Sequence, residues 1–155
     1  MNFPFGNLEP FKDFKIQSQV AQAIALELKT TLTPEEKQLI EKPPTSSLTA
    51  YDFYRRGLEA LQKYGLGGLN TESVKRAEIL FRNALEYDST FALAYTGLAE
   101  VCWKKYYLDN FLTNYMDSVL IFANKALSYD AQLAEAYFDR AGYYDYKGNP
   151  KMVIE

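Results

Sequence analysis

Two stretches of the chain repeat one pattern at a fixed, 42-residue spacing. Ala-Leu-Ala-Tyr at 92–95 is matched by Ala-Glu-Ala-Tyr at 134–137. The same spacing relates Asn-Ala-Leu-Glu-Tyr-Asp at 83–88 to Asn-Lys-Ala-Leu-Ser-Tyr-Asp at 124–130. Helix pairs that recur at a fixed period cannot bury their apolar faces alone. The spacing therefore predicts a stack of helix pairs, with the segment 91–129 at its centre.

Apolar residues follow a helical period along most of the chain, and no segment alternates with period two, so we predict an all-α fold. The predicted helices of the stack cover 47–64, 71–87, 91–108, 113–129 and 131–147. We expect three glycines within 65–68 to break the helix there. We do not expect this stretch to be a phosphate-binding loop, because no Gly-Lys-Ser/Thr ending follows and no strand precedes it.

The first part of the chain carries a different pattern. Residues 1–10 lack any period and are predicted to be an irregular tail. A helical period then starts near residue 11, with apolar positions at Ile16, Val20, Ala23, Ile24 and Leu28. Thr33-Pro34-Glu35-Glu36 predicts a second helix that starts with a capping box and stops before Pro43-Pro44. The predicted organisation is therefore a tail at 1–10, a helical adaptor at 11–46, and repeats at 47–91, 92–133 and 134–155, the last one truncated.

The repeated residues resemble the tetratricopeptide repeat, whose pattern is an aromatic, Leu-Gly and Tyr, followed by Ala, Phe, Ala and Pro. Tyr95, Leu98 and Ala99 take the first-helix places of the central repeat, and Ala123 and Ala126 take second-helix places. The resemblance covers about residues 50–155. It implies a right-handed solenoid of helical hairpins, here with long, 42-residue repeats.

Small residues are expected where the paired helices approach each other closely. They are Gly57, Ala99 and Ala141, and Ala99→Leu should overpack this contact by about 1–3 kcal/mol. The common repeat has about 34 residues, so this one carries eight more. Because residues 106–115 contain no Gly or Pro, we expect the additional residues to lengthen the two helices.

A second resemblance lies upstream. Phe-Lys-Ile-Gln-Ser-Gln-Val-Ala at 14–21, followed by Leu-Thr-Pro-Glu-Glu at 32–36, is similar to a bacterial linker. That linker connects a TolB-like domain, often found with cyclase or transcription-regulator modules, to tetratricopeptide repeats. The resemblance covers about residues 11–60. It implies that the chain could serve as an accessory module of a larger bacterial signalling protein.

The composition of the chain argues against catalytic and metal-binding functions. The chain has 155 residues and no histidine, so the usual general base and commonest metal ligand are missing. Cys102, the single cysteine, falls on an apolar helix face and is predicted to be a small core residue. Asp88 and Asp130 recur because each ends a helix at a turn, without calcium-loop spacing. We therefore expect a non-enzymatic protein with no cofactor and no metal.

The charge and hydropathy of the chain limit the kinds of partner that we expect. The net charge of −3 and the absence of a Lys/Arg stripe argue against nucleic acid. No apolar run approaches the roughly 18 residues of a membrane span. The cysteine usage fits a reducing cytoplasm. We therefore expect a cytoplasmic protein whose partner is another protein or a peptide, of a kind that the sequence does not name.

In tetratricopeptide stacks the first helix of each pair lines a concave groove that takes peptides. Helical phase gives the groove candidates in this chain: Tyr51, Tyr54, Arg55, Leu58, Leu93, Thr96, Glu100, Trp103, Glu135, Phe138, Asp139 and Tyr146. Chaperone-binding members of the family clamp a carboxylate with Lys, Asn and Arg. Here Tyr54, Leu58, Gly97, Glu135 and Asp139 occupy those places, so an apolar or basic peptide is the better fit.

Two other interpretations stay open at this stage. The aromatic residues could pack neighbouring helices instead of lining a groove, and for Trp103 beside Lys104 and Lys105 this packing role is favoured. The truncated repeat at 134–155 ends in apolar Met152, Val153 and Ile154. A solenoid normally covers such an end, so the segment could instead serve self-association into a homo-oligomer.

Overall fold

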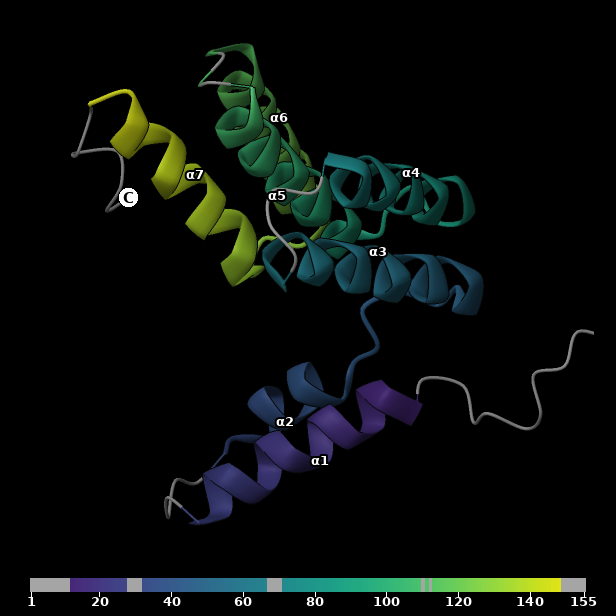
Figure 1. The fold of residues 1–155 in the computed structure, drawn as a ribbon. Coiled ribbons are helices and arrows are strands. Elements are labelled where there is room, and N and C mark those ends of the chain that lie inside the picture. The colour runs from purple at the N-terminus through teal and green to yellow at the C-terminus, as the bar shows by residue number, and fades with distance from the viewer. Residues whose placement is uncertain (1–11, 28–31, 67–70, 110, 112, 149–155) are drawn as a thin grey trace, which may run out of the picture. The chain divides into compact units, whose positions relative to one another are not determined.

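The computed structural model describes residues 12–27, 32–66, 71–109, 111 and 113–148, and these residues form helices without any β-strand. The chain divides into two compact units, Met1–Leu48 and Thr49–Glu155. Figure 1 labels the helices, which are α1 (Lys12–Glu27), α2 (Pro34–Glu41), α3 (Leu48–Leu66), α4 (Thr71–Tyr87), α5 (Ala92–Leu108), α6 (Thr113–Tyr129) and α7 (Ala134–Tyr146). The predicted all-α fold is confirmed over the described residues.

The predicted capping box at the start of α2 is present. The backbone N–H of Glu36 donates to Thr33 Oγ1 at 3.2 Å, and the backbone N–H of Thr33 donates to Glu36 Oε2 at 2.7 Å. Two of the helix's unpaired N-terminal groups are thereby satisfied. The helix ends at Glu41, two residues before Pro43, because proline cannot continue the hydrogen-bond ladder.

In the N-terminal unit, polar side chains join α1 to α2. Ser18 is buried and donates from Oγ to the carbonyl of Ile40 at 3.0 Å, while Gln22 donates to Glu41 Oε1 at 3.0 Å. The predicted apolar stripe of α1 is left about half exposed, at Ile16, Val20 and Ile24. Leu28, the last member of that stripe, and the predicted tail at 1–10 lie outside the described residues.

The helix bounds of the second unit agree with the predicted ones to within three residues. One expectation was wrong: α3 does not stop at Tyr64 but continues through Gly65 to Leu66. A single glycine costs a helix only about 1 kcal/mol relative to alanine, so it weakens the last turn without breaking it. The remaining residues of the predicted glycine loop, 67–70, lie outside the described part.

Helix α5 is the centre of this unit. It packs against α4, α6 and α7. A helix with several neighbours must be apolar on more than one face, and the buried residues of α5 are Ala92, Ala94, Thr96, Gly97, Leu98, Ala99, Val101 and Cys102. The prediction that Cys102 is a core residue is confirmed, and so is the burial of Ala99, which is 0% exposed.

Phe81 of α4 fills the space between α3 and α5. Its side chain is fully buried, and a Cβ atom added to either Gly57 or Gly97 would lie 2.6 Å from its ring. Real Cβ atoms essentially never come so close, so the ring is clamped between two glycines. The prediction of close approach at Gly57 is confirmed, whereas Ala141 is partly exposed and its neighbour Gly142 makes the tight contact, with Trp103.

The sequence period recurs in the turn hydrogen bonds. Asp88 accepts from the backbone N–H of Thr90 at 2.9 Å, and Asp130 accepts from that of Gln132 at 3.0 Å. Both carboxylates therefore serve the turns that follow α4 and α6, as predicted. The tyrosine hydroxyls that follow each turn donate to equivalent carbonyls at 3.0 Å, Tyr95 to Ser89 and Tyr137 to Ala131.

Side-chain packing repeats at the same spacing. A buried cluster includes Ala50, Ala84 and Ala94, and a second cluster includes their equivalents in the next repeat, Ala92, Ala126 and Ala136. Stacked rings follow the same rule, Phe53 with Tyr87 at 5.5 Å and Tyr95 with Tyr129 at 5.8 Å between centroids. The sequence period is thus a period of local structure.

Asp109 and Phe111 are described between α5 and α6. Each of these helices has 17 residues, consistent with the expected lengthening. Phe111 adopts a positive φ of 68°, which is uncommon for a residue with a side chain. Its N–H donates to the carbonyl of Tyr106 at 2.8 Å, and Tyr115 donates to Asp109 Oδ2 at 2.7 Å. These bonds connect Phe111 to the last turn of α5, and the end of α5 to the first turn of α6.

Candidate functional site

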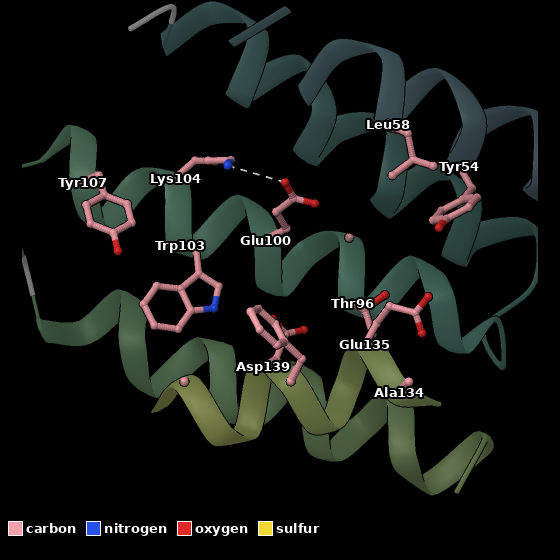
Figure 2. Close-up of a pocket in the computed structure, with 13 residues that line it drawn as sticks. Tyr54, Leu58, Thr96, Glu100, Trp103, Lys104, Tyr107, Ala134, Glu135 and Asp139 are labelled. Carbon is pink, nitrogen blue, oxygen red and sulfur yellow. Dashed lines mark ion pairs between the residues drawn. The ribbon is translucent and has the colours of Figure 1, made fainter. Parts of the chain in front are cut away.

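A groove of about 1000 Å³ lies in the second unit. Helices α3, α5 and α7 supply all of its lining, and α4 and α6 supply none. Figure 2 shows α3 on one side of α5 and α7 on the other. The lining residues are Tyr54, Leu58, Thr96, Gly97, Glu100, Trp103, Lys104, Tyr107, Ala134, Glu135, Phe138, Asp139 and Gly142.

Most of the residues that helical phase predicted for a groove come together here. Eight of the twelve line it, namely Tyr54, Leu58, Thr96, Glu100, Trp103, Glu135, Phe138 and Asp139. The other four do not. Tyr51 and Leu93 pack against the cluster around Phe91, and the ring of Tyr146 lies 5.5 Å from that of Tyr106. Arg55 also lies outside the lining, although its charge acts on the hydroxyl of Tyr54.

Five lining residues are absent from the list that helical phase gave: Gly97, which only the family resemblance had placed in the groove, Lys104, Tyr107, Ala134 and Gly142. A signal for two of them was present in the sequence. Lys104 and Tyr107 follow Glu100 by four and seven residues, and residues at this spacing share one face of a helix. Ala134 and Gly142 have little or no side chain, so no residue type singles them out.

Aromatic side chains form one end of the groove. The rings of Trp103 and Tyr107 are stacked with centroids 6.4 Å apart. Trp103 also packs on the buried cluster that contains Cys102, and it lies against Gly142, where an added Cβ would come within 2.8 Å of the indole. Trp103 therefore has both of the roles considered for it, since it packs between helices and lines the groove.

Apolar surface continues along the groove to α3. Tyr54 is half-buried, with its ring 5.1 Å from that of Phe91 and 5.8 Å from that of Phe81. Phe138 of α7, which also lines the groove, is 78% exposed, which is a large apolar exposure for a helix residue. An exposed aromatic at the edge of an apolar groove is the kind of residue that anchors a partner.

The polar lining is mainly acidic. Glu100 of α5 and Glu135 and Asp139 of α7 supply three carboxylates, and Lys104 supplies the one basic side chain. Lys104 Nζ lies 3.6 Å from Glu100 Oε1, as the dashed line in Figure 2 shows. Burial raises the pKa of the Tyr54 hydroxyl, and the charges of Glu135 and Glu100 raise it further, so these carboxylates act on the α3 side of the groove too.

Asp139 differs from the other carboxylates because it is only 7% exposed. Burial raises its pKa from 3.8 to about 7, and the charges of Glu100 and Glu135 add to the rise. The Trp103 indole acts in the opposite direction and lowers the pKa of Asp139, which places its Nε1 near the carboxyl. Nε1 is nevertheless buried without a hydrogen-bond partner among the described residues. A buried carboxyl group and a buried indole N–H thus lie near each other in the groove, and no cation is paired with the carboxyl.

Cys102 is a weak nucleophile in the folded protein. Burial raises the pKa of the Cys102 thiol to about 11, so the thiolate that reacts as a nucleophile is scarce at neutral pH. In the part of the chain that the structure describes, no group of three or more His, Cys, Asp or Glu side chains could hold a metal ion. None of the described helices is both long and apolar enough to cross a membrane.

Comparisons with protein-family models, with curated proteins and with solved structures gave no match to this chain. The resemblance to tetratricopeptide repeats therefore stays a prediction from the sequence. What bears on function is the repeated packing at the sequence period and the groove along α3, α5 and α7.

Proposed function

We propose that the protein is a non-enzymatic, tetratricopeptide-like scaffold that binds a segment of another protein in the groove between α3, α5 and α7. One observation carries the proposal: the first helix of each pair supplies the whole lining, and the second helices supply none. Helical-repeat proteins use their concave surfaces in this way, because each repeat adds one helix to a continuous binding face.

The chemistry of the groove supports a protein ligand. Tyr and Trp are enriched where proteins bind one another, and few such residues carry most of the binding energy. Here Tyr54, Trp103, Tyr107 and Phe138 line one continuous hollow. A volume of about 1000 Å³ accommodates several side chains of an extended or helical segment.

Selection from phage-displayed random dodecapeptides tests this function, with the whole chain immobilised. Recovered peptides are synthesised and titrated against the protein while the emission of Trp103, the single tryptophan, is recorded. Two matched variants identify the surface. Phe138→Asp places a charge in the groove. Ile121→Asp places the same charge on α6, where the native residue is 64% exposed and outside the lining.

The proposal expects peptides that shift the Trp103 emission and bind the Ile121→Asp variant as well as the native protein. Binding to Phe138→Asp should be lost, while its melting temperature stays within a few degrees of the native value because Phe138 is exposed. Failure to recover any specific peptide contradicts the proposal. Recovery of peptides that bind Phe138→Asp normally and fail on Ile121→Asp contradicts it as well.

A further inference from the structure

We propose that the segment bound in this groove carries an arginine or lysine side chain, and that Asp139 receives its positive charge. This inference rests on the proposed binding function and adds the chemical class of the ligand to it. Three observations carry it: the balance of charge in the groove, the burial of Asp139 without a counter-charge, and the aromatic rings beside it.

The charge balance favours a cation. Three carboxylates and one lysine line the groove, and that lysine already lies beside Glu100. Glu135 precedes Asp139 by four residues on α7, so the two side chains lie on the same face of the helix. Glu100 belongs to α5, which packs against α7, and its charge acts on Asp139. A cation between these helices would meet carboxylates from both sides.

Asp139 is buried but is left without a counter-charge. Among the described residues no ion pair reaches its carboxyl group, and the side chain that acts on it as a donor, the Trp103 indole, is uncharged. A buried carboxylate is unfavourable unless it is paired and hydrogen-bonded. A guanidinium or ammonium group supplies both the charge and the donors, and charge-assisted hydrogen bonds are among the stronger ones.

The surroundings of Asp139 suit an organic cation. Trp103 and Tyr107 present stacked rings in the same groove, and arginine and lysine are attracted to the faces of such rings. A metal ion is a poor occupant, because these carboxylates do not form a group that could hold one. A peptide carboxylate is disfavoured, since it would meet three like charges.

The cation should bind more tightly to the ionised form of Asp139, so binding should weaken on acidification. With a pKa of about 7, the ionised fraction falls about tenfold between pH 8 and pH 6. The titratable and charged groups around Asp139 are Tyr54 of α3, Glu135 and Arg140 of α7, and Glu100, Cys102 and Lys104 of α5. Helix α6 presents Asp117 to Tyr143 and Lys147, toward the C-terminal end of α7.

Four pools of acetylated and amidated heptapeptides test the inference against the whole chain. The central residue is arginine, lysine, citrulline or norleucine, and every other position is an equimolar mixture of alanine, leucine, serine and tyrosine. Citrulline matches arginine in shape without its charge. Biotinylated pools are immobilised, and binding of the native protein, Asp139→Asn and Glu135→Gln is measured by biolayer interferometry at pH 8 and pH 6. Circular dichroism verifies that each variant is folded.

The inference expects the arginine and lysine pools to bind the native protein about tenfold more tightly than the citrulline and norleucine pools at pH 8. The preference should fall to within about twofold in Asp139→Asn and should shrink at pH 6. Equal binding of charged and uncharged pools would overturn the inference while leaving groove binding intact. A preference that survives Asp139→Asn also overturns it. Binding of none of the pools counts against both proposals.

Discussion

Replacing Asp139 by asparagine is expected to stabilise the protein at pH 8 and to leave its stability almost unchanged at pH 4. Asparagine keeps the size of the side chain and removes the charge. The unfolded chain ionises this carboxyl with an ordinary pKa of 3.8, whereas the folded protein holds it at about 7, chiefly because it is buried. The fold therefore favours the protonated form and opposes the ionised one.

The magnitude follows from the two pKa values. Below pH 3.8 the group is protonated in both states and costs nothing. As the pH rises from 3.8 to 7, the unfolded chain gains the charge first, so the free energy of unfolding falls, and above pH 7 the loss is complete. A difference from 3.8 to about 7 corresponds to about 4 kcal/mol. Because Asp139 lines an open groove, solvent screening lowers this cost, so we expect about 2–4 kcal/mol, a sizeable part of the roughly 5–15 kcal/mol of a typical domain.

Urea unfolding followed by circular dichroism at 222 nm, at pH 4, 6 and 8 and constant ionic strength, measures the effect. The difference between Asp139→Asn and the native protein isolates this carboxyl from groups common to both. Glu135→Gln removes an exposed carboxylate from the same helix, and because its charge only adds to the raised pKa of Asp139, it should give a much smaller difference than Asp139→Asn. A difference for Asp139→Asn that is constant from pH 4 to pH 8 would refute the reasoning.

Three further predictions concern packing, an ion pair and a thiol. Gly57→Ala should lower the urea midpoint, because the added methyl group would overlap the ring of Phe81. Overpacking costs about 1–3 kcal/mol, which outweighs the gain of about 1 kcal/mol that alanine brings in helix propensity; an unchanged midpoint contradicts the clamp. Burial opposes ionisation of Glu78, but hydrogen bonds from Lys105 and Arg82 outweigh this effect and lower the pKa of Glu78. Glu78→Gln should therefore cost about 1 kcal/mol at pH 7, and this cost should shrink as the pH falls through the lowered pKa; a cost that does not change on acidification contradicts the pairing. Cys102 should react with a thiol reagent at least tenfold more slowly in the native protein than in urea-unfolded chain, since it is buried and its pKa is about 11, and equal rates would contradict its burial.

Much of the fold could be predicted because the spacing of the repeated residues can be read directly from the sequence. The 42-residue spacing placed the turns at Asp88 and Asp130, and the structure repeats their hydrogen bonds at that spacing. The end of α3 could not be predicted in the same way. Gly65 reads as a helix breaker locally, but one glycine in a last turn is tolerated when the rest of the helix is packed.

The site was predictable as far as helical phase determines it. Phase places Glu100 and Trp103 on one face of α5, and the structure brings both into the groove. Phase does not determine depth along the stack, so Tyr51 and Leu93 were predicted for a groove whose lining does not include them. The burial of Asp139 could not be predicted from the sequence either, because it depends on residues of different helices that pack around it.

The central claim is that α3, α5 and α7 together form the binding face, and nuclear magnetic resonance tests it most directly. The 15N-labelled protein is titrated with the tightest peptide from the display selection, and backbone amide shifts are followed. The account predicts that the largest changes fall around Tyr54, Thr96, Trp103 and Asp139, with α4 and α6 little affected. Changes confined to α1 and α2, or to α4 and α6, with the groove amides unmoved, would contradict it.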